Sequence, residues 1–275
     1  MKLLQTLVLS IALIFSLAGC FDSASKSNPM AKDNNSLSRV LESGVLHWGA
    51  DVVGGVPYVY EDPDNPGHYI GFEMDIARGI ASHMGVREEM VIRTWDSLIP
   101  ELQRGSFDFA MNGIEDTGDR EQIVLFSEPY YVYSQQLTVR KDSQDVNSLT
   151  DLTGKTVATL SGSAAEDLLR STQGITVRIN PEIIYSYADL EEGRADAVLL
   201  DTPIAAAYGA TNPKLKNVGE TFGQGTYVIA FRQEDTALKD AVNEALQKMK
   251  KSGELSAIFM KWGLMDSHQA KVDIQ

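Results

Sequence analysis

Residues 112–120 read NGIEDTGDR, and residues 126–131 read FSEPYY. The apolar stretch 107–111 before them is typical of a strand. The chain then reaches a glycine turn, and Arg120 follows Gly113 by seven residues. Backbone N–H groups at such a turn favour an anion, and a guanidinium adds a planar two-pronged donor. The run predicts carboxylate capture, and a surface loop with a solvated arginine is the alternative.

The sequence on both sides of this run alternates strand and helix patterns, which is typical of an α/β fold. A second unit of the same kind begins near Lys155. Ligands of such sheets bind beyond the carboxyl ends of the strands, so we expect a site between the two units. Strands are predicted at 45–50, 90–93, 107–111, 136–140, 155–159, 175–179, 195–200 and 226–231, and helices at 71–84, from Asp96 to Gly105, and at 164–171, 187–192, 203–208, 236–251 and 254–262.

The N-terminus has the pattern of a secretory signal peptide, which we assign to residues 1–19. Its apolar stretch 3–17 is short for a bilayer, which needs roughly 20 residues. The LAGC junction resembles the lipobox of bacterial lipoproteins, which implies that the thiol of Cys20 is lipidated and anchors the protein. A plain secretion signal or an uncleaved anchor is the alternative. Residues 20–37 are polar and are predicted to be a disordered, lipidated tether.

The formal net charge is −14, and cleavage before Cys20 removes only Lys2 among the charged residues, which gives −15. An acidic chain argues against nucleic acid as a partner. The four histidines lack metal-ligand spacing, and no nucleophile elbow, P-loop or dinucleotide fingerprint occurs. We therefore predict no catalytic residue, metal or cofactor.

Four further segments occur in the order and spacing of a known family. They are WGAD at 48–51 followed by Pro57 and Tyr58, GFEMDIA at 71–77, WDSLIPEL at 95–102, and GRADAV at 193–198. Together with NGIEDTGDR they resemble the solute-binding proteins of polar amino-acid ABC importers, from about Gly44 to Trp262. The resemblance implies the two-lobed type II periplasmic-binding-protein fold with a ligand in the cleft. Lobe one would be 38–131 plus 229–275, lobe two 136–225, and the crossings would lie near 131–136 and 222–226.

The resemblance also implies roles for site residues. Arg120 would grip the α-carboxylate of an amino acid with N–H groups near Gly113, and Asp201 would take the α-ammonium. The alternative role for Asp201 is that of a helix N-cap. Trp95 is expected to lie against the ligand, and its alternative role is ordinary core packing. The full predicted set is Asp51, Trp95, Gly113, Glu115, Thr117, Arg120, Ser163 and Asp201.

Three positions depart from the family pattern. Many relatives have Ser or Thr at the position of Glu115 and an aromatic residue at the position of Gly55. Some relatives also have a hydroxyl side chain at the position of Ala164. A carboxylate at position 115 cannot donate to a ligand carboxylate, so it must turn away, meet the ammonium or select a cation. The expected pocket has three carboxylates, Asp51, Glu115 and Asp201, against one arginine, Arg120. We therefore expect arginine or lysine to bind most tightly, glutamine-like ligands less tightly and acidic ligands most weakly.

The sequence thus predicts a monomeric, membrane-tethered, extracytoplasmic binding protein that delivers an amino acid to an importer permease. Two alternatives use the same scaffold. One is an enzyme resembling cyclohexadienyl or arogenate dehydratase, and the other is a sensor whose closed form docks on a receptor.

Overall fold

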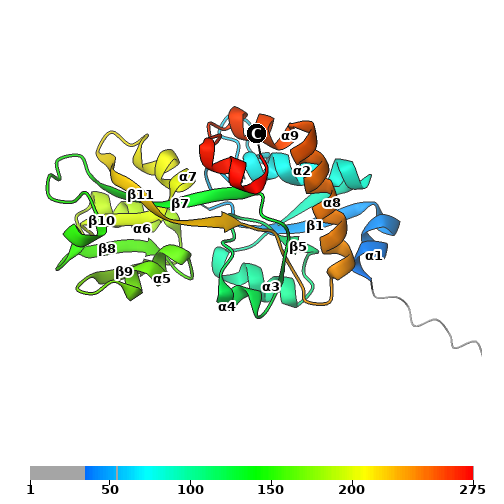
Figure 1. Cartoon of the computed structure of the whole chain (residues 1–275), viewed down its shortest axis with the longest axis horizontal. Coiled ribbons are helices and arrows are strands. Elements are labelled where there is room, and N and C mark those ends of the chain that lie inside the picture. Colours follow the sequence, from blue (N-terminus) through cyan, green and yellow to red (C-terminus); the bar gives the residue numbers. More distant parts are fainter. Residues whose placement is uncertain (1–34, 54, 275) are drawn as a thin grey trace, which may run out of the picture. The chain divides into compact units, whose positions relative to one another are not determined.

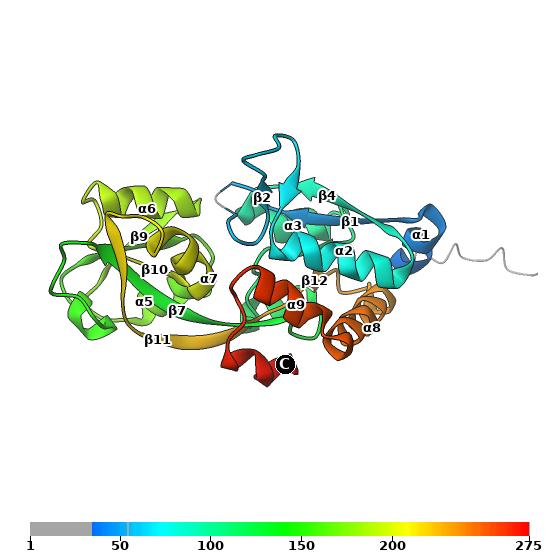
Figure 2. The same ribbon diagram turned by 90° about the horizontal axis from the view of Figure 1, so that it is seen from above.

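Two five-stranded sheets organise the chain, and each belongs to one lobe (Figures 1 and 2). The computed structural model describes residues 35–53 and 55–274, so the predicted signal peptide and Cys20 lie outside the described residues. The predicted two-lobed α/β fold is confirmed. The first sheet has the order β4-β1-β5-β12-β6, with β1 Val45–Ala50, β4 Arg87–Ile92, β5 Phe109–Ala110, β6 Leu125–Phe126 and β12 Ala230–Phe231. The second has the order β11-β7-β10-β8-β9, with β7 Tyr131–Arg140, β8 Thr156–Leu160, β9 Thr176–Asn180, β10 Ala197–Asp201 and β11 Leu215–Tyr227.

Parallel strands in both sheets bring their carboxyl ends to one edge. In the first sheet β1 runs parallel to β4 and β5. In the second, β8 runs parallel to β9 and β10. A short hairpin of β2 (Tyr60–Glu61) and β3 (Tyr69–Ile70) stands apart from both sheets.

Helices cover the sheets with their apolar faces. Helix α2 buries Ile76, Ala77, Ile80 and Ala81 and ends at Gly85, whose φ of 72° is a left-handed C-cap. In Figure 1, α8 and α9 lie beside α2, and α3 and α4 lie on the opposite side of the first sheet. The helices are α1 Ser36–Ser43, α2 Phe72–Met84, α3 Leu98–Gln103, α4 Gly118–Glu121, α5 Ala164–Ser171, α6 Ile183–Glu191, α7 Thr202–Ile204, α8 Thr236–Ser252 and α9 Glu254–Lys261, with short turns η1 Trp95–Ser97, η2 Leu149–Leu152, η3 Ala205–Gly209 and η4 Ser267–Val272.

Strands β7 and β11 pair antiparallel along their length and contain both predicted lobe crossings (Figure 1). Tyr227 stacks on Tyr133, with ring centroids 4.7 Å apart, and on Tyr131 at 5.6 Å. At Gly225 a Cβ atom would come within 2.5 Å of the Tyr133 hydroxyl, so this position needs glycine for a close approach. The aromatic stack therefore fixes how the two strands lie against each other.

Three local predictions were wrong. The tether does not extend to residue 37, because Asn35 caps α1 and the buried Ser36 donates to Asp235. The predicted strand 226–231 is split, because Tyr227 ends β11 in the second sheet and β12 joins the first. Asp96 does not cap a helix but lies within η1. The prediction of a helix at 203–208 is confirmed, because α7 continues into η3, a wider π-helical turn.

No helix in the described part of the chain combines the length and the apolar character needed to cross a membrane.

Candidate ligand-binding site

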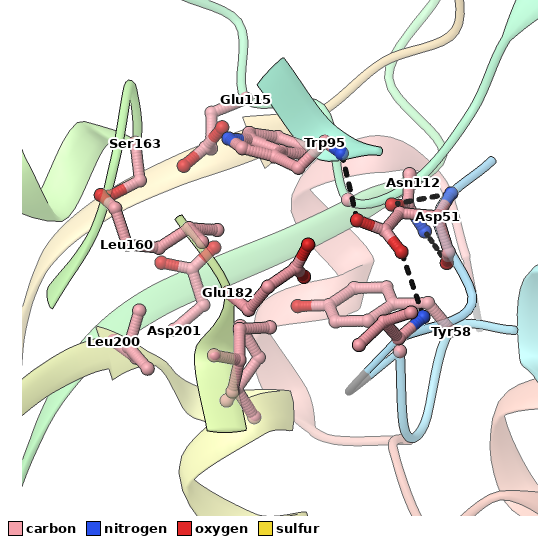
Figure 3. Close-up of a pocket in the computed structure, with 15 residues that line it drawn as sticks. Asp51, Tyr58, Trp95, Asn112, Glu115, Leu160, Ser163, Glu182, Leu200 and Asp201 are labelled. Atoms are coloured by element: carbon pink, nitrogen blue, oxygen red, sulfur yellow. Dashed lines mark hydrogen bonds between the residues drawn. The ribbon is translucent and has the colours of Figure 1, made fainter. Parts of the chain in front are cut away.

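A cleft of about 490 Å³ of empty space, its open mouth included, lies where the carboxyl ends of the parallel strands of the two sheets meet. Asp51 directly follows β1, and Asp201 ends β10. This is the position at which α/β sheets bind ligands. The lining residues are Asp51, Val53, Gly55, Tyr58, Trp95, Asn112, Gly113 and Glu115 from the first lobe, and Leu160, Ser163, Glu182, Ile183, Leu200, Asp201 and Ile204 from the second (Figure 3).

The charge of this lining is one-sided. Of the described residues that line the cleft, four carry carboxyl groups and none carries a basic side chain. Figure 3 shows the carboxyl groups in two places, with Asp51 and Glu182 on the Tyr58 side and Glu115 and Asp201 on the Ser163 side. The cleft thus has acidic residues in two places, and the apolar side chains labelled in Figure 3, Leu160 and Leu200, lie on the Ser163 side.

Asp51 anchors the first acidic end. Asp51 is buried, with 4% of its surface exposed. Its two carboxylate oxygens accept from the backbone N–H groups of Val53 and Trp95, each at 2.8 Å. Burial raises the pKa of Asp51, although these hydrogen bonds oppose the rise. Glu182, the N-cap residue of α6, faces it from the second lobe. Burial, and then the Asp51 charge, raise the pKa of Glu182 to about 7.

Asp201 forms the second acidic end and is 5% exposed. Its Oδ1 accepts from Gln135 Nε2 at 2.7 Å and its Oδ2 accepts from the Tyr227 hydroxyl at 2.6 Å. Burial, and then the Glu115 charge, hold the pKa of Asp201 well above its usual value. Asp201 does occupy the N-cap position of α7, but its side chain makes no capping hydrogen bond. A positive charge placed here would relieve the cost of keeping this buried carboxyl ionised.

Arg120 does not line the cleft, because the chain itself binds its guanidinium. Nη1 donates to Glu115 Oε2 at 2.6 Å and to the Glu115 carbonyl at 2.9 Å. Nη2 donates across to the Gly162 carbonyl at 2.8 Å, and Cζ lies 5.3 Å from the centre of the Trp95 ring. Thr117 also lies outside the lining, where its hydroxyl caps α4 by accepting from the Arg120 N–H.

The N–H group of Gly113 is also held by the protein. It donates to Glu73 Oε1 at 2.7 Å, and the Tyr130 hydroxyl donates to the same oxygen. Gly113 has a φ of 62°, and a Cβ atom there would come within 2.6 Å of the Tyr58 ring. Burial raises the pKa of Glu73 to about 7. Glu73 therefore fixes the turn at Gly113 through this buried hydrogen bond.

Ser163 and Trp95 line the cleft as expected, but both also make structural contacts. The Ser163 hydroxyl donates to the Leu160 carbonyl at 2.8 Å and caps α5 by accepting from the Glu166 N–H at 3.3 Å. The indole N–H of Trp95 donates to the Ser161 carbonyl at 2.8 Å, which links the lobes. Trp95 is partly buried and packs against two apolar clusters of the core, so it combines core packing with a place in the cleft lining.

Six of the eight predicted residues therefore lie in the lining, and Thr117 and Arg120 do not. Sequence reasoning missed Glu182 as a lining residue. It directly follows Pro181 beyond the end of β9, so the rule that sites form at the carboxyl ends of strands could have identified it. Tyr58 supplies an aromatic wall near Gly55, and its hydroxyl lies 2.6 Å from that of Tyr227. No group of three or more His, Cys, Asp or Glu in the described residues could hold a metal ion.

The buried Glu73 generates a prediction about stability. Its folded-state pKa of about 7 exceeds the ordinary value of 4.5, so its contribution is fully present below pH 4.5 and is lost as pH rises through 7. Relative to Glu73→Gln, which keeps an acceptor for Gly113, the wild type should lose roughly 3 kcal/mol of unfolding free energy between pH 4.5 and 8. Denaturant unfolding across this range measures the difference, and parallel curves for the two proteins would contradict it.

Comparisons with known proteins agree with this geometry. The model of the family described as bacterial extracellular solute-binding proteins, family 3, matches residues 52–265. The L-cystine-binding protein TcyJ of Escherichia coli (strain K12) is 32% identical over 233 residues, which cover 84% of this chain and 86% of that protein.

Solved structures of binding proteins superpose closely on the fold. An ancestral arginine-binding protein bound to arginine has a TM-score of 0.75 and 35% identity, covering 80% of this chain and 98% of its own. An ancestral amino acid-binding protein, AncCDT-1, described as a precursor of cyclohexadienyl dehydratase, has a TM-score of 0.76 and 31% identity, covering 83% and 99%. These relatives are binding proteins rather than enzymes, the dehydratase precursor included. The chain belongs to the family 3 bacterial extracellular solute-binding proteins, the family that serves polar amino-acid ABC importers.

Proposed function

We propose that this protein is the lipid-anchored substrate-binding component of an ABC importer and that it selects a cationic ligand, preferring arginine or lysine among the amino acids. One observation carries the selectivity: among the described residues that line the cleft there are four carboxyl groups and no basic side chain, and only Glu115 of the four is paired with a basic residue, Arg120. Family membership supports the role in import. A cation would neutralise the buried Asp201 and the partly buried Glu182, whose pKa values are raised, whereas an anionic side chain would meet like charge.

The aromatic walls fit the same ligand. Trp95 and Tyr58 both line the cleft, and a cation over an aromatic face is attracted by the ring quadrupole. Leu160, Leu200 and Ile204 offer apolar contact for the aliphatic part of a basic side chain. The cleft therefore combines acidic groups in two places with apolar and aromatic surface for the rest of the ligand.

The proposed mechanism is closure of two lobes about the paired strands β7 and β11. Lobe one would comprise 38–131 with 229–275, and lobe two 136–225. Hydrogen bonds from Trp95 to Ser161 and from Arg120 to Gly162 cross between them. A ligand that contacts Asp51 in one lobe and Asp201 in the other adds binding energy available only when the lobes are together. The closed monomer would then present its ligand to the permease.

The selectivity predicts an order of affinities. In calorimetric titration of the purified protein with arginine, lysine, glutamine and glutamate, arginine or lysine should bind most tightly and glutamate most weakly. A buried like-charge contact costs several kcal/mol, so glutamate should bind at least about 100-fold more weakly than the preferred ligand. Tightest binding to glutamate would show that the carboxyl groups do not face the ligand.

The proposed anchor depends on Cys20, which lies outside the described residues. Cys20→Ala should abolish labelling with fatty acid and move the protein out of the membrane fraction, because the acyl chains provide the attachment. Fractionation of cells expressing each form measures this. Equal membrane association of the two forms would contradict lipidation at Cys20.

A further inference from the structure

The guanidinium of Arg120 is bound by the chain itself, and Arg120 is not among the residues that line the cleft. Its two terminal nitrogens donate to Glu115 and to the Gly162 carbonyl, and its flat face lies over Trp95. Glu115 is 3% exposed, and the Arg120 side chain is 14% exposed. This is a hydrogen-bonded ion pair between a buried carboxylate and a partly buried guanidinium, and separating it leaves the buried carboxylate without a partner.

The backbone donors beside Arg120 are also taken by carboxylates of the chain. The Ala164 N–H, at the start of α5, donates to Glu115 Oε1 at 3.0 Å. The Gly162 N–H donates to Glu166 Oε2 at 2.7 Å, and the Gly113 N–H donates to Glu73 Oε1 at 2.7 Å. A guanidinium, a helix N-terminus and a glycine turn together are an arrangement suited to an anion. In this protein the carboxylates of Glu73, Glu115 and Glu166 occupy these donors.

Glu115 holds the central position among these donors. One carboxylate oxygen accepts from Arg120 and the other from Ala164, so its carboxylate makes the two contacts that a ligand carboxylate would otherwise make. An incoming carboxylate would have to displace it. The displaced Glu115 would then remain near the buried Asp201, with no basic side chain among the described lining residues to pair with it.

We propose that Glu115 permanently fills the anion subsite and that the ligand of this protein is an aliphatic cation with a positive charge at each end and no free carboxylate. The inference rests on the cation selectivity of the proposed function and narrows it. Asp51 with Glu182 in one place and Asp201 in the other are the sites for the two positive groups, because Glu115 is already paired with Arg120. The apolar lining residues Leu160, Leu200 and Ile204 and the aromatic rings of Trp95 and Tyr58 offer contact to an aliphatic spacer.

Paired ligands that differ only in the carboxylate test this. Agmatine is arginine without its carboxylate, and cadaverine is lysine without it. In calorimetric titration of the purified full-length protein, each amine should bind at least tenfold more tightly than its parent amino acid. Arginine methyl ester, which keeps the α-amino group and lacks the negative charge, should also bind more tightly than arginine.

Glu115→Gln separates the role of this residue from general charge effects. It removes the charge that pairs with Arg120, so the ratio of arginine affinity to agmatine affinity should rise at least tenfold over wild type. Glu244→Gln is the matched control, because it removes the same charge from an exposed position on α8 where Glu244 pairs with Lys248. The control should leave the ratio unchanged.

The outcomes separate this inference from the proposed function. Arginine binding as tightly as agmatine in the wild type would overturn the inference and leave cation selectivity intact, and this comparison does not depend on any variant folding. An unchanged ratio in Glu115→Gln would also overturn it. If glutamate binds more tightly than either cation, the proposed function fails, and this inference fails with it.

Discussion

The ion pair between Arg120 and Glu115 sets the charge of the whole cleft. The buried carboxylate of Glu115 needs a partner, and here the partly buried Arg120 supplies it from the same loop, five residues later. Because Arg120 is paired with Glu115, no basic side chain among the described residues remains to neutralise the other carboxyl groups of the cleft. Asp51, Glu182 and Asp201 consequently remain uncompensated, and burial raises the pKa of each. The cleft as a whole is therefore suited to a positively charged ligand.

The fold explains why these residues meet. Parallel strands deliver Asp51 and Asp201 to the carboxyl edges of two different sheets, and the antiparallel pair β7–β11 joins those sheets. Tyr227 belongs to this pair and donates to Asp201, so the joining strands also hold one acidic end of the site. Burial keeps the pKa of Tyr227 well above its usual value, so the phenol remains a donor.

Much of the fold could be predicted because local signals were strong. The helix at 164–171 was predicted with its observed bounds, since Ser163 is an N-cap residue before an amphipathic stretch. Helix α2 was predicted to within one residue from its apolar spacing and Gly85. The two-residue strands β6 and β12 carry too little pattern to locate, and their pairing is a tertiary property.

The sequence identified most of the residues that line the candidate site, but it did not predict which contacts they make. Asp51, Glu115 and Asp201 were identified from the sequence, and they do line the cleft. The direction in which Glu115 points depends on Ala164, which is 49 residues away and belongs to the other lobe. The pairing of Glu182 with Asp51 likewise forms only when the lobes fold together, so no local pattern could reveal it.

Proton release on ligand binding tests the central claim most directly. With a pKa of about 7, Glu182 is partly protonated at neutral pH, and a bound cation favours its ionised form. Calorimetry of agmatine or arginine binding at pH 7, in buffers of different ionisation enthalpy, measures the protons exchanged. The account predicts net release that is smaller in Glu182→Gln. Proton uptake, or no exchange in the wild type, would contradict a cleft whose carboxyl groups receive a cation.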